Sequence, residues 1–138
     1  MSSTTIRGGI AALALGLPVL TGAVAPSPAH AAAGDYRFEM VGKPQLANGK
    51  DIVRVRLLHI ADGKTVSDAV IFETKADMEP AGMPTMTAPA KLLKSSEPGI
   101  YQVEVDPGMT GSWAIRLAAK VQGETETVRG TFNTELAK

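Results

Sequence analysis

The 138-residue sequence contains no cysteine, and this absence removes several kinds of chemistry at once. The chain has no disulfide, no lipid-modified N-terminal cysteine and no thiol nucleophile. Histidine is almost as scarce, with only His30 and His59. A Ser-His-acid triad needs an oriented histidine, and no G-x-S-x-G motif lies near His59. With fourteen acidic residues, the chain has enough carboxylates for catalysis by a carboxylate pair, but none of them lies in a motif typical of such enzymes. We therefore predict that the protein is not an enzyme.

The sequence also has no net charge and no cluster of charge of one sign. Fourteen basic residues balance fourteen acidic ones. Without a basic tail or stripe, nucleic acid is not an expected partner. The chain likewise has no glycine-rich phosphate loop, no zinc-ligand spacing and no EF-hand.

The N-terminal segment has the pattern of a secretory signal peptide. "MSSTTIR" carries one positive charge, an uncharged apolar run follows, and "PSPAHA" ends with small residues at Ala29 and Ala31. We predict cleavage after Ala31, with Ala33 as the alternative. A retained membrane anchor is the other interpretation, but glycine and proline interrupt the run and no basic residues follow it. Residues 1–31 are thus a predicted signal peptide, and residues 32–138 a domain that is periplasmic or secreted, with no membrane span after cleavage.

The rest of the chain alternates apolar and polar residues with a period of two. This pattern is typical of antiparallel strands with one buried face, and turn sequences rich in glycine separate the segments. No helical periodicity is present. We predict a single all-β domain of about seven strands, an antiparallel β-sandwich, with a small barrel as the alternative. Trp113 is the expected centre of the core. The expected strands are 36–40, 52–60, 69–74, 90–94, 101–105, 113–120 and 127–132.

Methionine is concentrated in one segment, "MEPAGMPTM" at 78–86. Its prolines and glycine predict a loop of about a dozen residues between two strands, and loops of this length tend to be functional or disordered. Met78, Met83 and Met86 lie here, and Met109 lies in the turn "DPGMTGSW" at 106–113. Thioethers are soft, uncharged ligands that suit Cu(I). If the loop and the turn meet at one end of the sandwich, their sulfurs can converge on one ion.

Other interpretations of these residues remain open. Methionine also fills gaps in cores or forms adaptable contacts with partners. Met40, which shares a face with Tyr36 and Phe38, is expected in the core. His59 follows the inward phase of its strand, so a buried or strand-end histidine is favoured over a metal ligand. Asp77 and Glu79 beside the sulfurs either draw a cation inward or keep the loop soluble.

These residues resemble the YtkA-like/FixH-like domain family over about residues 35–134. In that family an "MPGM"-like segment precedes a "G-x-Y" strand, and a "P-M-x-G-x-W" turn opens the next one. The counterparts here are Met83, Pro84 and Met86, then Gly99 and Tyr101, then Met109, Gly111 and Trp113. Gly108 stands in place of the family's usual residue before the methionine.

The resemblance implies an immunoglobulin-like sandwich facing the periplasm or cell exterior and a role in copper handling. Members occur near heavy-metal efflux and cytochrome oxidase assembly systems. Some relatives keep a transmembrane segment, whereas this chain is expected to be released. The loop here has no histidine, which favours Cu(I) over Cu(II).

Two functional hypotheses follow. The first is an exported accessory protein that binds Cu(I) through Met83, Met86 and Met109, with Met78 as an auxiliary ligand. It would deliver the ion to or from an efflux or oxidase-assembly protein. The second is a metal-free interaction module whose methionine-rich loop is an adaptable apolar contact surface.

Overall fold

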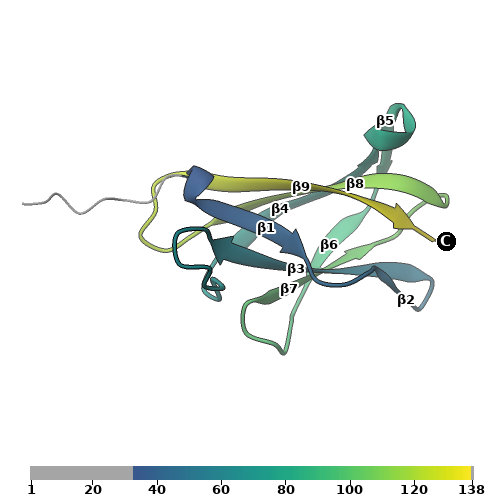
Figure 1. The fold of residues 1–138 in the computed structure, drawn as a ribbon. Coiled ribbons are helices and arrows are strands. Elements are labelled where there is room, and N and C mark those ends of the chain that lie inside the picture. Colours follow the sequence, from purple (N-terminus) through teal and green to yellow (C-terminus); the bar gives the residue numbers. More distant parts are fainter. Residues whose placement is uncertain (1–32, 138) are drawn as a thin grey trace, which may run out of the picture.

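The computed structural model describes residues 33–137, so the predicted signal peptide lies outside the described residues. Within them the chain forms nine β-strands and two short 3₁₀ helices (Figure 1). In chain order these are η1 (Ala33–Asp35), β1 (Tyr36–Met40), β2 (Gln45–Ala47), β3 (Lys50–His59), β4 (Val70–Met78), η2 (Glu79–Ala81), β5 (Met83–Ala88), β6 (Ala90–Leu93), β7 (Ile100–Val105), β8 (Gly111–Lys120) and β9 (Thr127–Leu136).

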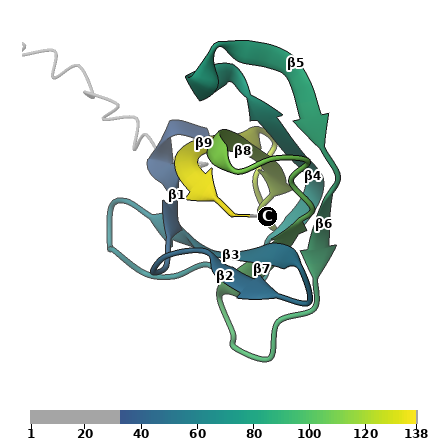
Figure 2. The same ribbon diagram turned by 90° about the vertical axis from the view of Figure 1, so that its right-hand side faces the viewer.

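The strands form two antiparallel sheets that face each other. One sheet has the order β1-β3-β7-β6, with β2 paired to the start of β3, and the other has the order β5-β4-β8-β9. Figure 2, which looks along the strands, shows the two layers enclosing the interior. The predicted all-β sandwich is therefore confirmed, and the barrel alternative is wrong.

The alternating residues of the central strands build the core. On β3 the inward residues Val53, Val55 and Leu57 are fully buried. On β8, Trp113 has no exposed surface, as expected for the centre of the core. Met40 packs against the core, as predicted, and is partly buried.

Phe38 closes the side of the sandwich where the two sheets meet. Its ring lies over Gly130 of β9, so that a Cβ added at Gly130 would sit 2.6 Å from Phe38 Cδ2. Phe132, further along β9, meets Phe38 edge-on with ring centroids 6.4 Å apart. The glycine thus makes room for an aromatic side chain from the opposite sheet.

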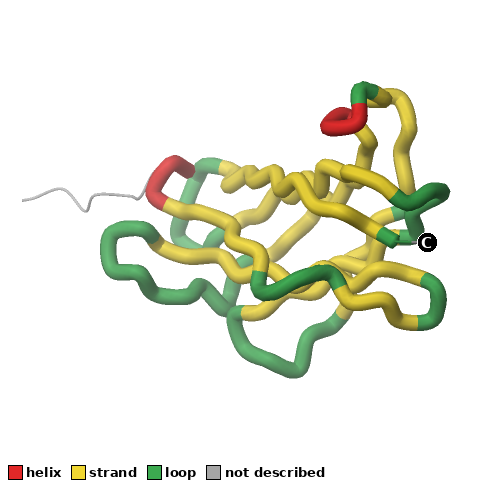
Figure 3. Tube along the Cα trace, turned by 45° about the vertical axis from the view of Figure 1, so that its right-hand side comes forward, coloured by secondary structure: helices red, strands yellow, loops and turns green. Residues whose placement is uncertain are grey.

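The seven predicted strands are present, but the predicted loop at 78–86 is wrong. β4 continues to Met78, η2 makes the turn, and β5 returns antiparallel, forming a hairpin that projects from the sandwich (Figure 3). Gly82 ends η2 with a φ of 76°, the left-handed conformation that glycine adopts without strain. β5 lies at the edge of its sheet, where proline is tolerated because one side of the strand has no partner.

Candidate functional site

The methionine-bearing hairpin and the β7–β8 turn lie at the same end of the sandwich (Figure 1). β4 and β8 run antiparallel with Asp77 opposite Ala114, so the last residue of β4 lies beside the first residues of β8. The β4–β5 hairpin therefore begins where the turn at 106–110 ends. We call this the methionine end, defined by Met78, Met83, Met86 and Met109.

Three of the four sulfur-bearing side chains at this end are accessible to solvent. The exposed fractions are 37% for Met83, 39% for Met86 and 39% for Met109. The exposed thioethers come from the hairpin and from the turn, two segments separated by more than twenty residues in the sequence. The fold thus places soft donors from both segments at one end of the molecule.

Met78 differs from the other three because it is only 2% exposed and belongs to the core. It lies directly opposite Met83 in the β4–β5 ladder, an arrangement that directs both side chains to the same face. Its methyl group also reaches the β7–β8 turn, 3.0 Å from where a Cβ at Gly111 would be. The burial of Met78 favours a packing role that joins the hairpin to the turn.

Met109 is held in place through its backbone. The indole Nε1 of Trp113 donates a hydrogen bond to the Met109 carbonyl over 3.1 Å. Gly111 lies between them and has a φ of 152°, a backbone conformation that residues with a side chain rarely adopt. The Met-x-Gly-x-Trp sequence therefore builds a fixed turn that leaves the thioether of Met109 partly exposed.

The two carboxylates beside the sulfurs are occupied by an arginine. Arg116 Nε donates to Asp77 Oδ2 over 2.8 Å, and Arg116 Nη2 also pairs with Glu79. The hydrogen bond from Arg116 is the largest cause that holds the pKa of Asp77 below its ordinary value. The two carboxylates serve the hairpin by anchoring it to β8. The sequence carries no local signal for this role, because Arg116 and its two partners come from segments that are far apart in the chain.

His59 lies at the opposite end from the methionines, because β3 runs the full length of the sandwich and ends there. Its Nδ1 is 3.1 Å from Asp62 Oδ1, and its ring stacks obliquely near Tyr36 with centroids 5.2 Å apart. The expectation of a strand-end histidine is confirmed. At this distance from the methionine end, His59 is not placed to add an imidazole ligand to an ion held by the methionine sulfurs.

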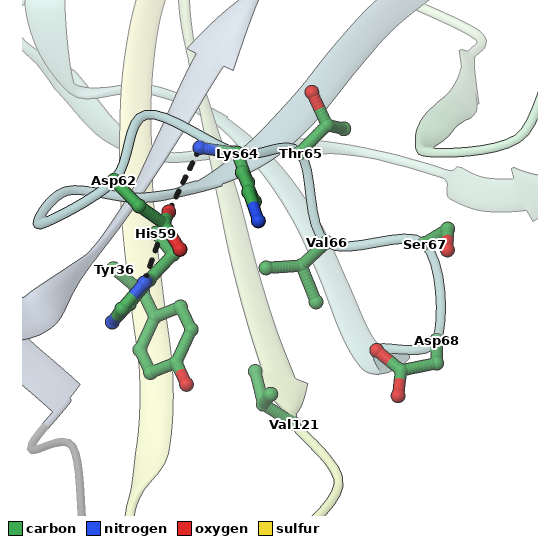
Figure 4. A pocket seen from close by; sticks show the side chains of 9 residues that line it. All are labelled: Tyr36, His59, Asp62, Lys64, Thr65, Val66, Ser67, Asp68 and Val121. Carbon is green, nitrogen blue, oxygen red and sulfur yellow. Dashed lines mark hydrogen bonds and ion pairs between the residues drawn. The ribbon is translucent and has the colours of Figure 1, made fainter.

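His59 lines an open pocket of ≈ 420 Å³ (Figure 4). Val66 and Val121 line its apolar side, and the Tyr36 hydroxyl donates to Glu124 Oε1 over 2.9 Å. Burial, then this hydrogen bond, raises the pKa of Tyr36 to about 12. Across residues 33–137, no group of three or more histidine, aspartate or glutamate side chains is placed to hold a metal ion. In that part of the chain, thioethers remain the candidate ligands.

The fold and the methionine end define an antiparallel β-sandwich that displays soft donors at one end. The chain belongs to the YtkA-like family, whose model matches residues 30–118. This match spans the hairpin and the turn, and it confirms the resemblance noted in the sequence.

A crystal structure of a DUF4426 family protein from Pseudomonas aeruginosa PAO1 has a similar fold. The TM-score is 0.52 at 18% identity, and the match covers 75% of this chain and 92% of that one. At this identity the likeness shows the fold alone. A search of curated proteins finds no match. Over the described residues, no helix has the length and apolar character needed to cross a membrane.

Proposed function

We propose that the protein is an exported accessory protein that binds Cu(I) at the methionine end and is not an enzyme. Met83, Met86 and Met109 are the proposed sulfur ligands. The observation that carries the proposal is the meeting of the hairpin and the turn at one end, with these three side chains partly exposed. Thioethers bind soft, monovalent copper in preference to harder divalent ions.

The surroundings of the three residues fit a soft, low-coordinate ion. The nearby carboxylates are paired with Arg116, so the hard oxygen ligands beside the sulfurs are already engaged. Thioethers carry no proton, so metal binding does not compete with protonation of the ligands. The buried Met78 supports the site by packing, and its sulfur is the auxiliary donor if the hairpin moves to expose it.

A metal titration tests the proposal. Purified protein is titrated with Cu(I) under reducing, anaerobic conditions against a competing chelator. We expect the double variant Met83→Leu, Met86→Leu and the variant Met109→Leu to lose at least about tenfold in affinity, or roughly 1.4 kcal/mol. Met40→Leu is the matched control, because it makes the same exchange at a partly buried residue of β1. Unchanged affinity in both methionine-end variants would remove these ligands from the proposal.

The second candidate function is a metal-free interaction module. It is favoured by the exposed Leu46, which is 57% accessible in the β2–β3 hairpin at the same end of the sandwich. Leu46 on one sheet and the three thioethers on the hairpin and the turn are exposed apolar side chains that a protein partner can contact at this end. Leucine in place of methionine keeps this surface and removes the sulfur. Partner capture that survives the leucine variants therefore supports the module, and loss supports the metal.

The partner is proposed on the same grounds. Cu(I) held by partly exposed sulfurs is accessible to a second protein. This suits transfer to or from a heavy-metal efflux or cytochrome oxidase assembly protein. Such transfer needs a ligand set that a partner can reach, and the exposed hairpin provides one. A pull-down with and without Cu(I) separates metal-dependent from metal-independent binding.

A further inference from the structure

Asp51 is the only charged side chain that is buried among residues 33–137, with 3% of its surface exposed. It lies near the start of β3, in the same inward phase as Val53 and Val55. Its neighbours across the sheet are Leu46 of β2 and Val105 of β7. An aspartate thus occupies an interior position at the methionine end of the sandwich.

The carboxyl group of Asp51 is only partly satisfied. It accepts a hydrogen bond from the backbone of Ala137, whereas its Oδ2 is buried and has no hydrogen-bond partner among the described residues. A buried ionised carboxylate with a free oxygen is far more costly than a neutral carboxylic acid in the same place. Unsatisfied buried groups of this kind call for a specific explanation.

No described cation compensates the charge. The neighbouring Lys50 is bonded through Nζ to Glu104 Oε1 over 3.0 Å, on the outer face of the sheet. Asp106, directly after the end of β7, is exposed, and Glu135 of β9 accepts a hydrogen bond from Ser112. β2 contributes no titratable side chain. The hydrogen bond from Ala137 is therefore the main polar interaction of Asp51 in the described structure.

We propose that the buried carboxyl group of Asp51 folds as a neutral acid, and that its ionisation as the pH rises loosens the C-terminal end of β9. The Ala137 N–H still favours the ionised group, but Oδ2 has no partner in the buried position. Oδ2 gains hydrogen bonds from water only if the side chain moves outward, and this movement strains the contact with Ala137. Leu136, the preceding residue, pairs with Gly111 in the β8–β9 ladder. Loosening here therefore reaches the turn that carries Met109.

The direction of the pH effect follows from burial, which raises the pKa of Asp51 above its ordinary value of 3.8. A raised pKa in the folded state means that folding favours the protonated form. The stability linked to Asp51 is fully present below pH 3.8 and is lost as the pH rises through the folded-state pKa.

The experiment compares metal-free wild-type protein with Asp51→Asn and with the exposed control Asp106→Asn. Thermal unfolding is followed from acidic to neutral pH. We expect Asp51→Asn to raise the Tm by roughly 4–8 °C at neutral pH, with the difference shrinking as the pH falls toward the ordinary value for aspartate. Hydrogen exchange at Gly111 and Leu136 should slow in this variant at neutral pH. Asp106→Asn should follow the wild type.

Two outcomes would overturn the proposal: equal Tm for Asp51→Asn and wild type at every pH, or a lower Tm for Asp51→Asn at neutral pH. If Asp51→Asn does not fold, NMR titration of the Asp51 carboxyl carbon in wild-type protein decides the matter, and a pKa at or below the ordinary value rejects it. Because no metal is used, failure here is independent of the copper proposal.

Discussion

Arg116 of β8 and Asp77 of β4 form the polar anchor of the methionine-bearing hairpin, with Arg116 Nε 2.8 Å from Asp77 Oδ2. The same guanidinium pairs with Glu79 in η2, the turn that follows. Asp77 Oδ1 also accepts the backbone N–H of Glu79 over 3.0 Å. One arginine thus fixes both the base and the turn of the segment that presents Met83 and Met86.

Replacing Arg116 by glutamine should raise the pKa of Asp77, because the largest cause of its lowering is removed. Because the folded state lowers the pKa of Asp77, its ionised carboxylate contributes stability at pH values above its unfolded-state pKa of 3.8. This contribution is lost as the pH falls through the folded-state pKa of Asp77. The variant should therefore lose less stability on acidification than the wild type. Carboxyl NMR titration and acid unfolding measure both effects. Arg129→Gln is the control, and an unmoved Asp77 pKa would contradict the assignment.

Gly111→Ala should destabilise the protein by about 1–3 kcal/mol, because alanine disfavours a φ of 152° and its methyl group meets Met78 Cε. Met78→Ala alone should cost about 2–5 kcal/mol through the cavity it leaves. The double variant should cost less than the sum, since the contact is then absent. Urea unfolding measures all three. Gly108→Ala is the control, because an added Cβ there meets nothing within 4 Å. If the cost of the double variant equalled the sum of the two single costs, the contact between residues 78 and 111 would be contradicted.

Tyr101→Phe should destabilise the protein by about 1–3 kcal/mol. The Tyr101 hydroxyl donates to the Val66 carbonyl over 2.9 Å and accepts from the Ala69 N–H over 3.2 Å. Without it, two backbone groups lose their partner and the 60–69 connection should exchange amide hydrogens faster. Cu(I) affinity should stay unchanged, because this connection lies at the end opposite the methionines. A shift in affinity would show coupling between the ends.

Tyr36 should ionise at about pH 12, later than free tyrosine at 10.0. The folded state favours the neutral phenol, so the stability linked to Tyr36 is lost as the pH rises from 10.0 through about 12. Tyr36→Phe should remove this alkaline loss, although it also frees Glu124 from its hydrogen bond. Spectrophotometric titration of the phenolates is the measurement. Ionisation of both tyrosines near 10.0 would contradict it.

Strand positions and the core were predictable from the sequence, because apolar and polar residues alternate along a strand according to which face is buried. Val53, Val55 and Trp113 follow that pattern and are fully buried. β5 was not predictable in this way, since proline and glycine in 78–86 favour a loop unless the segment is an edge strand. The family resemblance pointed correctly to the Met-x-Gly-x-Trp turn. Whether the sulfurs hold copper stays a prediction.

The partners of Arg116 and Asp51 were not predictable because they depend on strand register. Arg116 and Asp77 are separated by 39 positions and meet only through the pairing of β4 with β8. Asp51 follows a turn sequence and looks like a solvated residue there, yet the β3 alternation places it inside. Local patterns do not specify which distant strand lies opposite.

The prolines of the projecting hairpin have a consequence for the protein's solubility. Pro84 within β5, and Pro89 directly after it, have no amide hydrogen to offer to an approaching strand. An outer strand with gaps in its donor row is a poor template for another copy of the chain. The molecule can therefore expose apolar, sulfur-bearing side chains along the edge of a sheet without further copies adding strands to that edge.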